Sequence, residues 1–353
     1  MPKDAVPLGE LGRALVVKLR HHGDVLLAAP VLGALKAAAP RLEIDALVYD
    51  DTAPMLAGHP ALSRLHAVGR KWKAERIWTR FFLESGLFSA LRKRNYDLIV
   101  HLSEQPRGAW LARSLGARYS VAPAIHDRGN FWEKSFTHLY PLPKNGRRHQ
   151  VELNLDALRR IGLQPDAGDR KVVFVPGAEA EKRIDPLVEA KAFIHVHPAS
   201  RWRFKCWPAE KNAALIDRLS AKFKVVLTAA PDAEELSFVE NIVKSARTSP
   251  LNLAGKLSIK ELGALAARAR LFVGVDSMPM HLAGAMGTPT VALFGPSGEH
   301  EWGPWKVAHR VVASAHPCRP CGNDGCGGSK VSECLTTLEV DRVHSACEEL
   351  LLG

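Results

Sequence analysis

Two common nucleotide-binding signatures are missing from this chain of 353 residues. No GxGxxG motif follows the first predicted strand, and no GxxxxGK motif followed by Ser or Thr occurs anywhere. The first motif supplies the glycine turn that holds a dinucleotide pyrophosphate, and the second supplies the loop that wraps phosphates in P-loop enzymes. Dinucleotide oxidoreductases and P-loop NTPases are therefore not favoured.

The chain also lacks a long apolar run. The longest stretch without Asp, Glu, Lys or Arg lies between Asp276 and Glu299, and Pro279, Pro289 and Pro296 interrupt it, so no membrane-spanning helix is predicted. The first apolar run is short and has charges on both sides, unlike the core of a signal peptide, which favours a cytoplasmic location. With 46% hydrophobic and 24% charged residues, the composition is typical of a globular protein with ample core.

Cysteines are few, and their number bears on compartment and metal binding. Without an export signal, the six cysteines indicate a reducing compartment in which thiols stay free or bind metal. Four of them follow the pattern C-x2-C-x4-C-x7-C, in which only the first pair has the usual zinc spacing; they are Cys318, Cys321, Cys326 and Cys334. Either they hold a structural zinc ion or they are free thiols. No catalytic metal and no cofactor are expected.

Positive charge is concentrated in the first half of the chain. Residues 1–165 carry 25 Lys and Arg against 15 Asp and Glu, a net of +10, whereas residues 166–353 carry 23 against 22. This pattern is explained either by solvated helix faces or by an anionic partner, such as a phosphorylated molecule or a membrane surface. Nucleic acid is not favoured, because no recognisable nucleic-acid module accompanies the charge. Candidate contact residues are Arg70, Lys71, Lys73, Arg76 and Arg128.

Short β-rich runs alternate with helical patterns along the chain, which predicts an α/β fold with parallel sheets. A helix is expected from Val25 onward, and an amphipathic helix closes the chain at Leu338–Leu351. Strands are predicted at Ala14–Leu19, Ile44–Val48, Leu98–Leu102, Phe193–His197, Lys224–Leu227, Leu271–Val275 and Thr290–Phe294.

A polar stretch divides this pattern into two Rossmann-like domains. The first domain is expected at 1–165, a linker at 166–190, and the second domain at 191–353 with the Cys-rich tail and the final helix. Ligands of open α/β sheets bind beyond the carboxyl ends of the strands, so two such domains facing each other form a cleft. We expect the chemistry in that cleft.

Polar residues follow several predicted strands. Asp24 follows Gly23 at a predicted helix start, where it is either an N-cap or a base. Asp232, Glu234 and Glu235 of the TAAPDAEEL segment are expected to complement a helix dipole and not to contact a ligand. His281 lies in the first turn of a helix whose free N–H groups are suited to a diphosphate, and it is either a ligand contact or a core histidine.

Three segments belong together: GD after the first strand, KCWP in the second half, and GVDSMPMHLAGAMGTPTVALFGPSGEHEWGPW. With these segments the chain resembles glycosyltransferase family 9, the bacterial lipopolysaccharide heptosyltransferases. VVKLRHHGDVLLAAPVLGALK and CRPCGNDGCGGSKVSECL are most similar to the heptosyltransferase III subgroup. The resemblance implies a GT-B architecture, with the acceptor held by the first domain and the nucleotide sugar by the second. It also implies inverting, metal-independent transfer of heptose from ADP-L-glycero-D-manno-heptose to the inner core of lipopolysaccharide.

The resemblance also implies roles for individual residues. Asp24 matches the general base, and Lys205 matches the lysine near the donor phosphates. Asp276 matches the acid that holds the heptose hydroxyls, and Arg201 departs from a threonine in relatives. The implied donor-binding set is Ser200, Arg201, Leu257, Asp276, Ser277, Met278 and His281.

The implied acceptor is anionic, which accounts for the basic first half. The protein is then expected to work at the cytoplasmic face of the inner membrane, through peripheral contacts made by charge. Two alternatives stay open. One is a family 9 enzyme that uses another nucleotide sugar or another glycan acceptor. The other is a non-catalytic protein that binds anionic glycans or a membrane surface.

Overall fold

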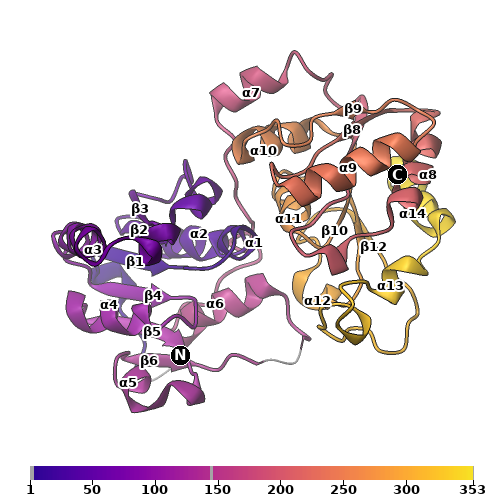
Figure 1. The fold of residues 1–353 in the computed structure, drawn as a ribbon. Helices are drawn as coiled ribbons and strands as arrows, with labels where there is room; N and C mark the ends of the chain where they lie inside the picture. The colour runs from indigo at the N-terminus through magenta and orange to yellow at the C-terminus, as the bar shows by residue number, and fades with distance from the viewer. Residues whose placement is uncertain (1–3, 144–145, 353) are drawn as a thin grey trace. The chain divides into compact units, whose positions relative to one another are not determined.

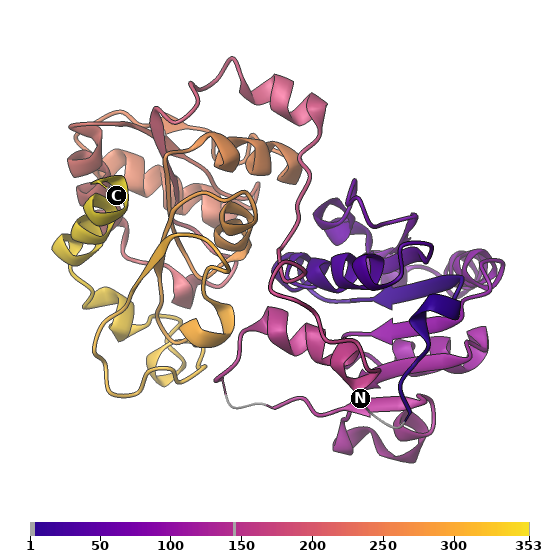
Figure 2. The same cartoon turned by 180° about the vertical axis from the view of Figure 1, so that it is seen from behind.

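The computed structural model describes residues 4–143 and 146–352. Contacts within the chain divide it into unit 1, which ends at Phe174, and unit 2, which begins at Val175. The division falls inside the segment 166–190 where the sequence predicts a linker. In each unit, helices flank a central sheet (Figures 1 and 2). No helix in the described part of the chain is long and apolar enough to cross a membrane.

Unit 1 is an α/β unit with six parallel strands. Its 3-10 turns include η2 (Asp50–Met55), η3 (Arg70–Ala74) and η4 (His126–Arg128). Its strands and α-helices are, in chain order, β1 (Arg13–Val17), α1 (His22–Leu26), α2 (Ala29–Ala38), β2 (Glu43–Tyr49), β3 (Arg64–Val68), α3 (Ile77–Arg92), β4 (Leu98–His101), α4 (Arg107–Leu115), β5 (Tyr119–Pro123), α5 (Gly129–Glu133), β6 (His138–Tyr140) and α6 (Gln150–Arg160).

Unit 2 repeats the arrangement with six more parallel strands. Its 3-10 turns are η5 (Arg203–Lys205) and η6 (Cys326–Gly328). The other elements are α7 (Ala178–Ile184), β7 (Phe193–His197), α8 (Ala209–Ser220), β8 (Lys224–Leu227), α9 (Ala233–Ser245), β9 (Leu251–Asn252), α10 (Ile259–Arg268), β10 (Leu271–Val275), α11 (Met278–Ala285), β11 (Thr290–Leu293), α12 (Glu299–Trp302), β12 (His309–Val312), α13 (Glu333–Thr336) and α14 (Val340–Leu352).

Alternating side chains on the strands of unit 2 supply core to both faces of the sheet. Ile194 and Val196 of β7 pack with Ile216 of α8, on the face that α9 and α14 also cover. Phe193 points the other way and packs with Leu265 of α10. Burial on both faces explains why these strands are continuous apolar runs in the sequence.

The predicted α/β class with parallel sheets is confirmed, and one local prediction needs correction. The helix expected from Val25 onward is two helices, because α1 ends at Leu26 and α2 begins at Ala29, with Pro30 in its first turn. The segment 166–190, expected to be a linker, contains α7. Ala180 and Ile184 of α7 pack into the core of unit 2.

A buried polar cluster links β2 to the segment before β4. Arg94 donates from Nε to Asp45 Oδ2 at 2.7 Å, and the Tyr96 hydroxyl donates to the same oxygen at 2.7 Å. Asp45 is fully buried. Burial alone would raise the pKa of Asp45, but hydrogen bonds from His66, Arg94 and Tyr96 outweigh it and hold that pKa well below its usual range.

Asp45→Asn should lower the free energy of unfolding by about 3–5 kcal/mol, because it leaves the buried Arg94 guanidinium without its main counter-charge. Urea denaturation near pH 7 measures the change. The pKa of Asp45 is lower in the folded than in the unfolded protein, so its contribution is present above the unfolded pKa of about 4 and is lost as the pH falls.

The matched control is Glu43→Gln. Glu43 also accepts from Arg94, at 2.6 Å, but its side chain is 44% exposed, so the loss should stay within about 1 kcal/mol. Equal losses in the two variants would show that burial does not set the strength of this cluster.

Candidate functional site

Strand order reverses at one point in each sheet. The orders are β3-β2-β1-β4-β5-β6 and β12-β11-β10-β7-β8-β9, so the switch lies between β1 and β4 in unit 1 and between β7 and β10 in unit 2. Ligands of doubly wound sheets bind beyond the carboxyl ends of the strands at such a switch. Asp24 follows β1, Ser200 and Lys205 follow β7, and Asp276 follows β10. The predicted site residues therefore lie next to the two switch points.

Asp24 is not an N-cap. His21 occupies the N-cap position of α1, and Asp24 is the third residue of that helix. The interpretation of Asp24 as a cap is therefore wrong, because the helix begins earlier than the apolar pattern indicates. The Asp24 side chain is only 11% exposed, and its Oδ1 lies 3.5 Å from Arg20 Nε. It is thus a largely buried carboxylate beside a cation, as a positioned acid or base requires.

Lys18 is a second feature of this switch point that the sequence analysis missed. Its Nζ is buried and donates to Leu102 O at 2.8 Å and to Asn154 Oδ1 at 2.9 Å. Burial lowers the pKa of Lys18 to about 8, while the negative charge of Asp24 opposes the shift. A lysine inside the apolar run ALVVKL was the available signal.

The five predicted acceptor cations are in different situations. Arg70 Nε lies 2.8 Å from Asp51 Oδ2, and its Nη2 donates to Arg20 O at 3.0 Å. Because Arg20 also contacts Asp24, Arg70 belongs to the surroundings of the switch point in unit 1. The other four are exposed on η3, at the start of α3 and on η4: Lys71, Lys73, Arg76 and Arg128.

In unit 2, the two strands at the switch point bring Lys205 and Asp276 together. Lys205 Nζ donates to Asp276 Oδ2 at 2.6 Å, although 71 positions separate them in the chain. The side chains are 22% and 7% exposed, so the pair is largely buried and Lys205 is its more accessible member. A lysine held in this way can exchange a carboxylate oxygen for a phosphate oxygen, since both are anionic acceptors.

The neighbouring predicted donor residues surround this ion pair along the chain. Ser277 is the N-cap residue of α11, and Met278 is its first residue, so the Met278 N–H group lies just beyond Asp276. Pro279 has no N–H group, and Met280 N donates to Ser277 O at 3.1 Å. His281 is buried, with its ring 6.4 Å from that of Trp302. Ser200 is buried as well.

Two predicted donor residues differ from this group. Arg201 is exposed, and its guanidinium lies over the Trp202 ring at 5.5 Å. Leu257 is half-buried and packs on the apolar cluster of α7 and α10. Leu257 follows β9, the edge strand of this sheet. Both β7 and β8 therefore lie between β9 and the switch point.

Two hydrogen bonds join the segment that carries Lys205 to the C-terminal part of the chain. Ser332 Oγ donates to Phe204 O at 2.7 Å, and Trp207 Nε1 donates to Leu338 O at 3.0 Å. These bonds bracket Lys205 on both sides. The position of its ammonium group therefore depends on residues more than a hundred positions later.

Glu301 of α12 is a further residue that the sequence analysis did not single out. Burial raises the pKa of Glu301, and the nearby Asp276 carboxylate raises it further. The loop before α12 is tied down by Arg319, which donates to Gly295 O at 2.7 Å and to Glu299 Oε2 at 3.1 Å. Asp276 therefore interacts with two groups of unit 2, the Lys205 ammonium and the Glu301 carboxyl group.

The remaining acidic segment, after β8, has a structural role. Asp232 is the N-cap of α9 and accepts from Glu234 N at 3.0 Å and Glu235 N at 3.3 Å. Glu235 turns back and accepts from Ala230 N at 2.9 Å. All three acidic residues lie at the start of α9, the position expected of groups that complement a helix dipole.

The Cys-rich tail contains free thiols in the structure. Cys318 and Cys321 are exposed, whereas Cys334 is buried. His316 Nδ1 lies 3.2 Å from Cys318 Sγ. Within residues 4–143 and 146–352, no three His, Cys, Asp or Glu side chains are arranged to hold a metal ion.

The chain matches the family model described as glycosyltransferase family 9 (heptosyltransferase) over residues 85–331. It is 39% identical over 293 residues to lipopolysaccharide heptosyltransferase 3 from Escherichia coli, covering 81% of this chain and 84% of that protein. It is 26% identical over 367 residues to lipopolysaccharide heptosyltransferase 1 from Pseudomonas aeruginosa, covering 97% and 98%.

Two solved structures with a similar fold are a glycosyltransferase family 9 protein and a heptosyltransferase. The glycosyltransferase family 9 protein from Veillonella parvula superposes with a TM-score of 0.83 at 24% identity, over 99% of both chains. The E. coli heptosyltransferase WaaC with ADP superposes with a TM-score of 0.76 at 21% identity, over 96% of this chain and 99% of that one. The expected two-domain GT-B fold is therefore confirmed.

Lys18→Met should change how stability depends on pH. The pKa of Lys18 is about 8 in the folded protein, whereas a lysine in an unfolded chain has a pKa of about 10.4. Between these values the unfolded chain binds more protons, so this residue makes the free energy of unfolding rise with pH, by up to about 1.4 kcal/mol per pH unit. The variant should lose that rise.

Denaturation of both proteins at several pH values from 7 to 11 measures the difference. Lys222→Met is the matched control, because the Lys222 side chain is 72% exposed. A wild-type curve parallel to that of Lys18→Met throughout this range would contradict the burial of a titrating ammonium group.

Proposed function

Because the chain belongs to glycosyltransferase family 9, we propose that it transfers heptose from ADP-heptose to the inner core of lipopolysaccharide, as a heptosyltransferase III-like enzyme. The observation that carries the proposal is the 39% identity over 81% of the chain to lipopolysaccharide heptosyltransferase 3. The ion pair of Lys205 and Asp276, at a switch point suited to a nucleotide sugar, supports it.

In this proposal, Asp24 is the general base of a single displacement. It removes the proton from an acceptor hydroxyl as the hydroxyl oxygen bonds to the anomeric carbon of the heptose. The bond from that carbon to the ADP oxygen breaks at the same time, and attack from the opposite face inverts the anomeric configuration. Arg20 Nε lies 3.5 Å from Asp24 Oδ1, and the buried Lys18 ammonium interacts with the same carboxylate through its charge.

Unit 2 is proposed to hold the donor. Lys205 and the free N–H group at the start of α11 bind the diphosphate, with Ser200, Arg201 and His281 around it. Negative charge builds up on ADP as it leaves, so Lys205 stabilises the transition state more than the ground state and no metal ion is required. Asp276, released from Lys205 by the phosphates, accepts hydrogen bonds from the heptose hydroxyls, and Leu257 contacts the adenine.

Unit 1 is proposed to hold the anionic acceptor through its basic residues, with Arg70 beside the switch point. The protein is then placed at the cytoplasmic face of the inner membrane by peripheral contacts. Lipopolysaccharide core carries negative charge, so attraction to a basic unit favours encounter.

Mass spectrometry of truncated lipopolysaccharide core, incubated with the protein and ADP-heptose, should show the addition of one heptose. Parallel reactions with other nucleotide sugars should give no product, because donor choice depends on contacts to the sugar hydroxyls. Product with another nucleotide sugar alone would reassign the donor. A folded protein that binds ADP but gives no product with any core would contradict the proposed acceptor.

Asp24→Asn should lower kcat by about 10²–10⁴-fold, which is the usual contribution of a general base. Binding of ADP should stay close to that of the wild type, because the proposed donor residues all lie in unit 2. Asp127→Asn, an exposed carboxylate of the same unit, is the control and should keep its activity. Wild-type turnover by Asp24→Asn would overturn the base assignment.

A further inference from the structure

Helix α3 exposes an unusual amount of apolar surface. Ile77 is 82% exposed, Trp78 75%, Phe81 61% and Phe82 70%, and Leu91 is the one residue of this helix that is buried. Large side chains that are exposed singly are common on proteins, whereas a contiguous apolar patch marks a surface that binds something.

The exposed residues lie on one face of the helix. At about 100° per residue, Ile77, Trp78, Phe81 and Phe82 span an arc of about 140°. Leu87 and Leu91 lie about 80° and about 40° beyond Ile77, next to this arc, and pack into the core of unit 1. The helix therefore has one wide apolar surface, of which the fold buries only one edge.

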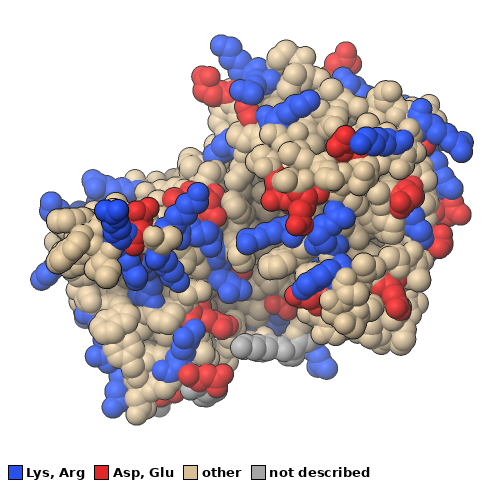
Figure 3. Space-filling model, viewed as in Figure 1, with Lys and Arg blue, Asp and Glu red and all other residues tan. Residues whose placement is uncertain are grey.

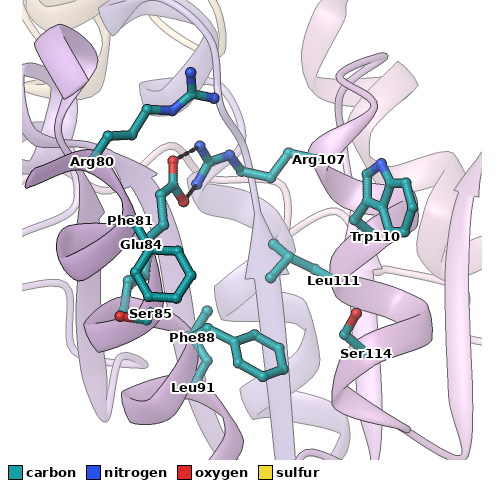
Figure 4. Close-up of a pocket in the computed structure, with 11 residues that line it drawn as sticks. Arg80, Phe81, Glu84, Ser85, Phe88, Leu91, Arg107, Trp110, Leu111 and Ser114 are labelled. Carbon is teal, nitrogen blue, oxygen red and sulfur yellow. Dashed lines mark hydrogen bonds and ion pairs between the residues drawn. The ribbon is translucent and has the colours of Figure 1, made fainter. Parts of the chain in front are cut away.

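The apolar surface continues onto the neighbouring helices. Trp110 of α4 is 61% exposed and Phe131 of α5 is 40% exposed, with their ring centroids 4.8 Å apart. Phe81 and Trp110 line the same groove between α3 and α4, in which Glu84 and Arg107 form an ion pair (Figure 4). We call the six exposed residues the aromatic face: Ile77, Trp78, Phe81, Phe82, Trp110 and Phe131.

Cations border the aromatic face. The segment from Arg70 to Arg80 carries five Lys and Arg against one acidic residue, and Arg113 lies with its guanidinium 4.9 Å from the Phe131 ring. Figure 3 has the same view as Figure 1, and where Figure 1 labels α3 it shows uncharged surface flanked by Lys and Arg side chains. We call the exposed cations of this border the basic rim: Lys71, Lys73, Arg76, Arg80 and Arg113.

We propose that the aromatic face inserts into the interface of an anionic phospholipid bilayer while the basic rim contacts the headgroups. Trp and Phe on one side with Lys and Arg around them is the composition of helices that lie in a membrane interface. The inference deepens the proposed function, because it rests on the peripheral membrane contact proposed there and names the surface that makes it.

Charge decides between a bilayer and a second copy of this chain. Two copies that met through their aromatic faces would bring two basic rims together, which like-charge repulsion opposes. An anionic bilayer complements the rim and buries the apolar side chains at the same time. Binding should consequently have a component that salt does not remove, in contrast to the purely electrostatic contact expected from the sequence.

The test is sedimentation of the full chain with vesicles of phosphatidylethanolamine and phosphatidylglycerol, with no donor or acceptor present. The protein should bind these vesicles, bind phosphatidylcholine vesicles more weakly, and stay partly bound at about 1 M NaCl, where the Debye length is about 3 Å. The double variant Phe81→Ser, Phe82→Ser should lose affinity for the vesicles by at least about tenfold, both at low salt and at about 1 M NaCl.

The control is Leu352→Ser, because Leu352 is 88% exposed but lies in α14 of unit 2; it should bind vesicles as the wild type does. Wild-type affinity in the double variant, or complete release of the wild type by salt, would overturn the proposal. So would a wild-type dimer that the double variant abolishes in the absence of vesicles, since the aromatic face would then be a contact between copies.

A second measurement separates this proposal from the enzymatic one. The double variant should transfer heptose to a deacylated, water-soluble core at the wild-type rate, because neither phenylalanine belongs to the proposed site. Loss of transfer together with loss of vesicle binding would show that the two substitutions disturb unit 1 as a whole and would contradict a membrane-specific role. If the wild type transfers nothing but binds vesicles as described, the proposed function fails and the membrane surface stands.

Discussion

Parallel pairing around one strand in each sheet determines where chemistry can occur in this protein. β1 pairs with β2 and β4, and β7 pairs with β8 and β10. The chain leaves the two strands of a switch point toward different sides, so no connection covers the edge between them. Lys18 and Asp24 lie at that edge in unit 1, and Lys205 and Asp276 lie there in unit 2. The polar residues at both switch points owe their positions to the order of the strands more than to the local sequence.

Each switch point pairs a lysine with a carboxylate, but the two are built differently. Lys18 is buried, and its Nζ donates to Leu102 O and Asn154 Oδ1. Its charge interacts with that of Asp24 without a direct contact. Lys205 is partly open and bonds Asp276 directly. Lys205 can therefore exchange its carboxylate partner for another anion, whereas the Lys18 ammonium stays bound to groups inside unit 1.

Local signals in the sequence predicted much of the fold. Buried parallel strands are continuous apolar runs, so Phe193–His197, Lys224–Leu227 and Leu271–Val275 agree with β7, β8 and β10 residue for residue. Strands at or toward the sheet edges, such as β3, with its exposed Arg64, have weaker patterns and were not predicted. The start of α1 was misplaced because His22 and Gly23 carry no apolar signal. The contact of Lys205 with Asp276 joins positions 71 apart, and spacing in a sequence does not report such a contact. The family resemblance named both residues but not their pairing.

The support of Lys205 by Ser332 and Leu338 has a consequence for the order of synthesis. These partners lie 128 and 131 positions after Phe204 and Trp207, and a ribosome makes the chain from its first residue onward. A nascent chain that has already completed β7, β8 and β10 still lacks the bonds that hold η5 in place. The strands can pair early, but the nucleotide-sugar pocket proposed for unit 2 matures only when translation has passed Leu338. The groups around Asp24 in unit 1 can form earlier, since the partners of Lys18 and Asp24 all precede residue 155.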